Sequence, residues 1–117
     1  MERDFEQEIR EAVDKVFCAM ESRVSAEDMA RIHQAYDLAS EAHSAQRRKS
    51  GEPYIIHPIS VALIAATELK LDANSVIASF LHDVVEDTDY TIGDIARLFG
   101  DDVAHLVNVV TKKKKDR

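Results

Sequence analysis

Apolar residues recur along this chain at intervals of three and four, which is the pattern of helices that are buried on one side only. The first such segment covers about residues 3–21. The second begins after Ser25, where Asp28 completes the pattern of a helix N-cap, and extends to about Ala45. Their expected buried residues are Phe5, Ile9, Val13, Val16, Phe17 and Met20 in the first helix and Met29, Ile32, Tyr36, Ala39 and Ala42 in the second.

The helical pattern stops at residues 46–54 and then returns in four further segments. The expected helices are one that opens at His57-Pro58, one from Asp72 to about Asp87, one over 92–99 that is capped by Thr91 and Gly100, and one from Asp101 or Asp102. Core positions are expected at Ile59, Ala62, Leu63, Ala66 and Leu69 in the first of these and at Val103, Leu106, Val107 and Val110 in the last. With only 3 Gly and 2 Pro to interrupt helices, the sequence predicts an all-α fold of about six helices.

The helix that ends near Asp87 carries apolar and acidic residues on opposite sides. At about 100° per residue, one sector roughly 140° wide holds an imidazole and three carboxylates. These residues are His82, Asp83, Glu86 and Asp87, and the core side is expected to comprise Ile77, Leu81, Val84 and Val85. The carboxylates repel one another at the negative end of the helix dipole, so a divalent cation would stabilise them. A solvated acidic helix end is the alternative, because a His-Asp dipeptide alone is weak evidence for a metal.

Two further features could belong to the same site. His57 is expected at a helix N-terminus, where a positive charge is unfavourable, so a neutral imidazole able to bind a metal is the easier state. Three cations at residues 47–49 precede Gly51, a combination that suits phosphate binding but could equally form a solvated turn. His43 lies near the end of the second expected helix and is interpreted as local structure rather than as a ligand.

Composition and charge limit the classes of protein that fit. Apolar residues make up 45% of the 117 residues, enough for one modest core, and no apolar run approaches the ~20 residues of a membrane span. No signal peptide is visible. The net charge of −7 disfavours general binding to nucleic acid or anionic lipid. The single Cys18 allows no internal disulfide and no multi-cysteine metal site, which is consistent with a reducing cytoplasm.

Four motifs occur in a specific order and spacing: HSAQRRKSGEPYIIHP at 43–58, FLHDVVEDT at 80–88, Phe99-Gly100, and Val110-Thr111-Lys112. Together they closely resemble the hydrolase domain of RelA/SpoT-type alarmone proteins, which belong to the HD phosphohydrolase superfamily. The resemblance runs from about Ala26 to Lys112. We accordingly expect an N-terminal amphipathic helix over 1–24 and an HD-domain helical bundle over 25–117.

The resemblance implies an enzyme domain that removes pyrophosphate from the 3′ position of (p)ppGpp and yields GDP or GTP. It also implies Mn²⁺ as the cofactor. By motif, His57, His82 and Asp83 match three of the family's metal ligands. These are the residue types that bind Mn²⁺ and similar ions.

The same resemblance assigns roles to residues around the metal. Glu86 and Asp87 match the pair that positions and activates the attacking water. Arg48 and Lys49 match contacts to the bound nucleotide, with Ser50 nearby. These roles suit the chemistry of the residues. Carboxylates accept and donate protons, and cationic side chains bind phosphate in a protein that is otherwise acidic.

One departure from the family concerns the end of the sequence. The family's fourth metal ligand is an aspartate in a later helix, and nothing after residues 110–112 resembles the segment that carries it. We therefore expect the sequence to be the front part of a longer protein. Alone, it is expected to bind metal weakly or not at all and to hydrolyse ppGpp far more slowly than the parent protein. We also expect bare apolar side chains on the central helix and on Val103, Leu106 and Val110, and self-association through that edge.

Two alternatives stay open. The parent protein could act mainly as a (p)ppGpp synthetase, a GTP pyrophosphokinase, in which this domain is regulatory. The domain could instead be a non-catalytic module for oligomerisation. The His82-Asp83 and Glu86-Asp87 pairs are both intact, which favours hydrolysis because domains that lose this activity usually lose these residues.

Overall fold

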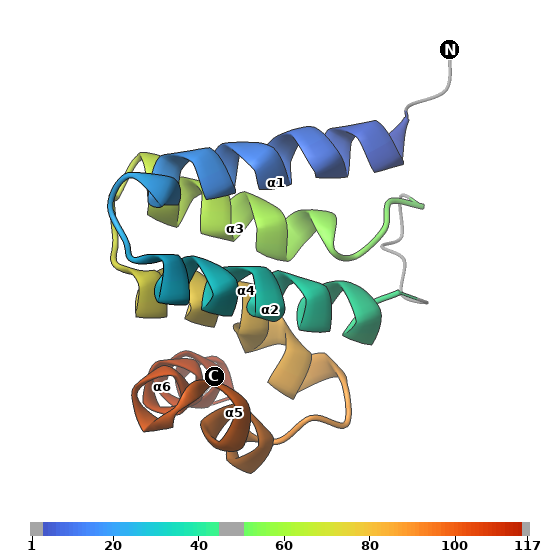
Figure 1. Ribbon diagram of the computed structural model, residues 1–117. Helices are drawn as coiled ribbons and strands as arrows, with labels where there is room; N and C mark the ends of the chain where they lie inside the picture. Colours follow the sequence, from blue (N-terminus) through green and yellow to red (C-terminus); the bar gives the residue numbers. More distant parts are fainter. Residues whose placement is uncertain (1–3, 45–50, 116–117) are drawn as a thin grey trace.

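The computed structural model of the protein describes residues 4–44 and 51–115, with side chains as far as residue 109. Six α-helices make up this part of the chain and confirm the predicted all-α class (Figure 1). They are α1 (Phe5–Glu21), α2 (Ala26–Ala42), α3 (Ile56–Thr67), α4 (Ala73–Asp87), α5 (Ile92–Phe99) and α6 (Asp101–Lys115).

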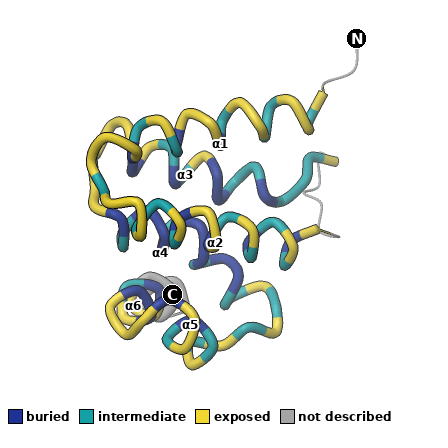
Figure 2. The backbone as a smooth tube through the Cα atoms, in the orientation of Figure 1, coloured by how far each residue is buried: buried dark blue, intermediate teal, exposed yellow. Residues whose placement is uncertain are grey.

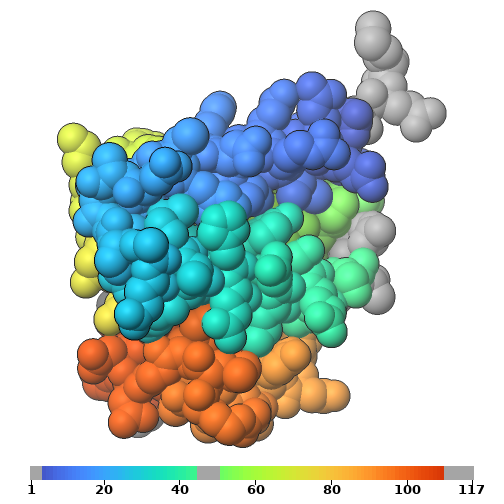
Figure 3. Space-filling view, viewed as in Figure 1, coloured from blue at the N-terminus to red at the C-terminus, as the bar shows by residue number. Residues whose placement is uncertain are grey.

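Helix α4 lies at the centre of the fold and packs against α2, α3 and α6. Helix α1 lies across α3 and α2, and α5 packs against α6 (Figure 1). On the face shown in Figure 3, α1, α2 and the α5–α6 pair form most of the surface and largely cover α3 and α4. This arrangement explains why α3 and α4 contribute more buried residues than α1 and α2, and why α1 is exposed along one side (Figure 2).

The core is continuous across the helices. Helix α4 contributes eight buried residues, and α1 contributes three to the same core. The buried residues of these two helices are Val13, Val16 and Met20 in α1 and Ala73, Val76, Ile77, Ala78, Phe80, Leu81, Asp83 and Val84 in α4. All but Asp83 are apolar, so the one buried charge in α4 requires a specific explanation.

Local sequence fixes where the helices begin. Ser25, Asp72 and Thr91 each accept a hydrogen bond from a backbone N–H three residues later, as the sequence predicts. Thr91 and Asp94 form a reciprocal capping box, since the Asp94 side chain accepts from the Thr91 N–H at 3.0 Å. These caps satisfy N–H groups that have no partner inside the helix.

Some expected boundaries differ from the structure. Helix α3 begins at Ile56, through 3₁₀-type bonds from Ile56 N–H to the Pro53 carbonyl and from His57 N–H to the Tyr54 carbonyl. Pro58 is consequently the third residue of the helix, but it still lies in the first turn, where its missing N–H costs little. Helix α2 ends at Ala42, three residues earlier than expected.

One core prediction was wrong. Leu69 is 61% exposed because α3 ends at Thr67 and the chain turns at Lys70, which has a left-handed φ of 52°. Val103 is fully buried, which confirms its predicted core position. The expectation of bare apolar side chains was wrong for Val103 and for the central helix α4, because these side chains pack into the common core. The side chain of Val110 lies outside the described part of the chain. Within that part, no helix combines the length and apolar character needed to cross a membrane.

Candidate metal centre

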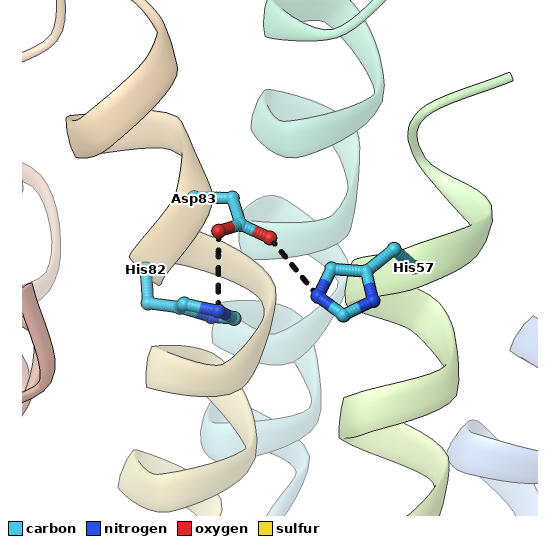
Figure 4. A group of neighbouring side chains, drawn as sticks. All are labelled: His57, His82 and Asp83. Carbon is cyan, nitrogen blue, oxygen red and sulfur yellow. Dashed lines mark ion pairs between the residues drawn. The ribbon is translucent and has the colours of Figure 1, made fainter. Parts of the chain in front are cut away.

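His57, His82 and Asp83 converge on one point between α3 and α4. Figure 4 shows the two imidazoles on either side of the Asp83 carboxylate. His57 Nε2 lies 3.5 Å from Asp83 Oδ2, and His82 Nε2 lies 3.3 Å from Asp83 Oδ1. One nitrogen or oxygen from each residue lies within 4.8 Å of those of the other two. The structure therefore brings together the three residues that the motifs suggested as ligands.

The tautomer of His82 can be read from its second nitrogen. Nδ1 lies 3.0 Å from the backbone carbonyl of Ser79, one turn earlier in α4. A carbonyl can only accept a hydrogen bond, so in the neutral ring Nδ1 carries the proton and Nε2 carries a lone pair. That lone pair faces an oxygen of Asp83. A cation between His82 Nε2 and the Asp83 oxygen would stabilise this arrangement. A hydrogen bond from the other ring nitrogen to a backbone carbonyl commonly orients histidines that bind metals.

Burial sharpens the same argument. The side chain of Asp83 is 0% exposed, while His82 is 12% exposed and His57 is 39% exposed. A carboxylate removed from water needs a compensating positive charge. Two ligand atoms that each lie about 2.1 Å from one ion, at an angle of about 90–110°, are about 3.0–3.4 Å apart. The contacts of 3.3 and 3.5 Å around Asp83 are close to this range. The residues present therefore fit a divalent cation.

Two more carboxylates lie one turn further along α4. Glu86 is half-buried and Asp87 is exposed. The Tyr54 hydroxyl donates a hydrogen bond to Asp87 Oδ2 at 3.0 Å. Burial, followed by the negative charge of Asp83 and the bond to Asp87, raises the pKa of Tyr54, so its hydroxyl keeps its proton as a donor.

Tyr54 is a residue of this site that sequence reasoning missed, because it lies in the segment 46–54, where the helical pattern stops and gives no guide to side-chain direction. Its position three residues before His57, inside the motif at 43–58, is the signal that could have identified it. His43 is 1% exposed, and its ring lies 4.9 Å from that of Tyr54. The expected phosphate-binding residues Arg48, Lys49 and Ser50 lie outside the described residues.

A groove of about 500 Å³ lies beside His82, between α3, α4 and α6. It is lined mainly by apolar side chains, with His82 and His105 among the polar ones. His105 is exposed.

Comparisons with known proteins show the family of this chain. A family model described as HD domain matches residues 35–117. The chain is 53% identical over 85 residues to a bifunctional (p)ppGpp synthase/hydrolase SpoT of Escherichia coli (strain K12), a match that covers 73% of this chain and 12% of that protein. It is 48% identical over 81 residues to a probable GTP pyrophosphokinase of Mycobacterium leprae (strain TN), covering 69% of this chain and 10% of that protein.

A solved structure described as a metazoan ortholog of SpoT that hydrolyses ppGpp is similar in three dimensions. It has a TM-score of 0.67 and 38% sequence identity, and the match covers 75% of this chain and 49% of that one. This chain thus spans only about 12% of the length of the first curated relatives. The resemblance to RelA/SpoT-type hydrolase domains that the motifs indicated is confirmed, and the chain belongs to the HD-domain family.

Proposed function

We propose that this chain is a metal-dependent guanosine-3′,5′-bis(diphosphate) 3′-pyrophosphohydrolase domain that acts on (p)ppGpp with Mn²⁺. The observation that carries the proposal is the convergence of His57, His82 and the buried Asp83. Relatives that bear the name of this activity support the choice of substrate. We further propose that the protein acts in the cytoplasm, which suits its single cysteine, Cys18.

The reaction adds water across the bond between the 3′ oxygen of the nucleotide and its diphosphate. His57, His82 and Asp83 would hold the cation, which when bound neutralises phosphate charge and makes water more acidic. Glu86 and Asp87 would orient the attacking water and accept its proton, because they lie on the turn of α4 that follows Asp83.

The substrate needs local positive charge, since the protein has a net charge of −7. Arg48 and Lys49, with Ser50 nearby, are the proposed contacts, because a guanidinium presents paired donors to phosphate.

The test is hydrolysis of ppGpp at saturating Mn²⁺, with GDP and pyrophosphate separated by anion-exchange chromatography. Turnover is expected to stop in EDTA and to fall by about 10²–10⁴ in Glu86→Gln, the usual effect of removing a proton acceptor. His33→Ala is the control, because His33 lies on α2 against Phe17 rather than in the cluster. A protein that binds Mn²⁺ but does not hydrolyse ppGpp would contradict the proposal.

A second candidate is a regulatory or oligomerisation module of a (p)ppGpp synthetase. Relatives named GTP pyrophosphokinase or probable GTP pyrophosphokinase match 69–80% of this chain, which is the observation in its favour. It predicts metal binding without hydrolysis and self-association of the chain. Sedimentation together with the turnover assay separates the two candidates.

A further inference from the structure

Four rings form a row from the end of α2 to the candidate metal centre. The ring of His43 lies 4.9 Å from that of Tyr54, Tyr54 lies 6.2 Å from His57, and His57 lies 6.3 Å from His82, measured between ring centroids. The C-terminal end of α2 and the N-terminal end of α3 lie at the same side of the molecule (Figure 1). The row therefore links α2 to residues on α3 and α4.

His43 is the buried end of this row. It is the C-cap residue of α2 and is 1% exposed, although it is neither in the metal cluster nor on α4. Its ring is inclined by 33° to that of Tyr54 and lies beside it, with the two centroids 4.9 Å apart. Burying an imidazole costs free energy unless its contacts compensate, so a local role at the helix end does not by itself explain this placement.

Tyr54 connects the ring of His43 to Asp87, one of the two carboxylates proposed to act on the attacking water. Tyr54 lies two residues before Ile56, where α3 begins, so its side chain is not held within a helix. Its hydroxyl nevertheless meets Asp87 Oδ2 at 3.0 Å, 33 residues further along the chain. A hydrogen bond of this length requires a fixed ring orientation. The rings of His43 and His57, which lie beside Tyr54, can supply that orientation.

We propose that His43 is a positioning residue. Its ring holds Tyr54 so that the hydroxyl donates to Asp87, and this bond fixes the Asp87 carboxylate for its part in the reaction. The consequence for catalysis rests on the proposed function, whereas the coupling between the three side chains does not. The two parts can therefore be tested separately.

The first test measures coupling without turnover. Tyr54→Phe, Asp87→Ala and the double variant give a double-mutant cycle in the unfolding equilibrium constant, from urea titrations. The Tyr54–Asp87 bond is expected to contribute roughly a three- to tenfold coupling, because Asp87 is exposed and its bond is correspondingly weak. In a His43→Ala background this coupling is expected to disappear, and in His43→Phe, which keeps a flat ring beside Tyr54, to persist.

The second test measures hydrolysis of ppGpp at saturating Mn²⁺. Tyr54→Phe and His43→Ala are each expected to lower kcat about tenfold with KM and Mn²⁺ affinity within about twofold of the wild type, by the loss of one hydrogen bond to a charged group. The double variant is expected to be no slower than either single one, since both changes act through the same bond. Tyr36→Phe and His33→Ala are matched controls on α2, where both rings contact Phe17.

Each outcome has a distinct meaning. Coupling that survives in His43→Ala, or kcat losses that multiply in the double variant, would overturn the positioning role. An inactive wild-type chain would overturn the proposed function, while loss of coupling in His43→Ala would still support the role of His43.

Discussion

Replacing Asp83 by asparagine tests the metal centre most directly, because the change removes one negative charge and keeps the shape of the side chain. Asp83 is fully buried, and its two oxygens face His57 and His82 at 3.5 and 3.3 Å. An amide would direct an N–H₂ group at one of these imidazoles in place of a negative oxygen. We therefore expect Asp83→Asn to lose the site while α4 and its packing persist.

The size of the effect follows from linkage between binding and folding. At a metal concentration ten times Kd, an ion that binds only the folded state stabilises it by RT ln 11, about 1.4 kcal/mol. For a chain of 117 residues this corresponds to a rise in Tm of about 5 °C. Because the calculation refers to multiples of Kd, it holds for weak binding too, provided that Mn²⁺ is titrated far enough.

The assay is thermal unfolding followed by circular dichroism, in EDTA and then across a Mn²⁺ titration. The wild type is expected to show the rise of about 5 °C at ten times Kd, and Asp83→Asn to show less than about 1 °C at the same concentration. The midpoint in EDTA identifies any general folding defect. Asp37→Asn, an exposed carboxylate on α2, is the matched control and should keep the full rise. An equal rise in Asp83→Asn would place the ion elsewhere and refute the reasoning.

Three further predictions concern the core, a helix cap and the basic loop. Phe80→Ala removes a fully buried ring that contacts Tyr36 and should lower the free energy of unfolding by about 3–5 kcal/mol in urea titrations. Asp72→Ala should cost about 1 kcal/mol at pH 7. Hydrogen bonds from Ser75 lower the pKa of Asp72, so this contribution is present above the unfolded pKa of 3.8 and should fade in titrations at lower pH. Arg48→Ala should weaken ppGpp binding more than Mn²⁺ binding, measured by calorimetry, and equal loss of both, or of neither, would contradict its assignment.

Much of the fold could be predicted because helices leave local signals in the sequence. The boundaries of α5 were predicted to the residue, since Thr91 and Gly100 are caps whose chemistry is local. The end of α4 was predicted near Asp87, which is its last residue. The expected end of α3 was wrong at Leu69, where the turn at Lys70 depends on contacts that no local pattern encodes. The presence of a helix is thus set by nearby residues. The position of a helix end that lacks a capping residue depends on tertiary contacts instead.

The site shows the same limit more clearly. Helical spacing placed Asp83 and Asp87 in one polar sector, yet Asp83 is fully buried and Asp87 is exposed. Helix α3 packs against α4 and brings His57 to within 3.5 Å of Asp83, a contact that no property of α4 alone reveals. The contact of Tyr54 with Asp87 also joins residues 33 positions apart. Pairings of this kind come from tertiary packing and are invisible to periodicity.

The row of rings also gives the protein an optical property. The chain has no tryptophan, so its near-ultraviolet fluorescence comes from 3 tyrosines. Tyr54 alone among them adjoins His57 of the candidate metal centre, whereas Tyr36 lies between Phe17 and Phe80. A paramagnetic ion quenches an excited ring only at short range, so Mn²⁺ held by His57 would dim Tyr54 selectively. If the proposed centre binds Mn²⁺, the fluorescence of Tyr54 will report its occupancy.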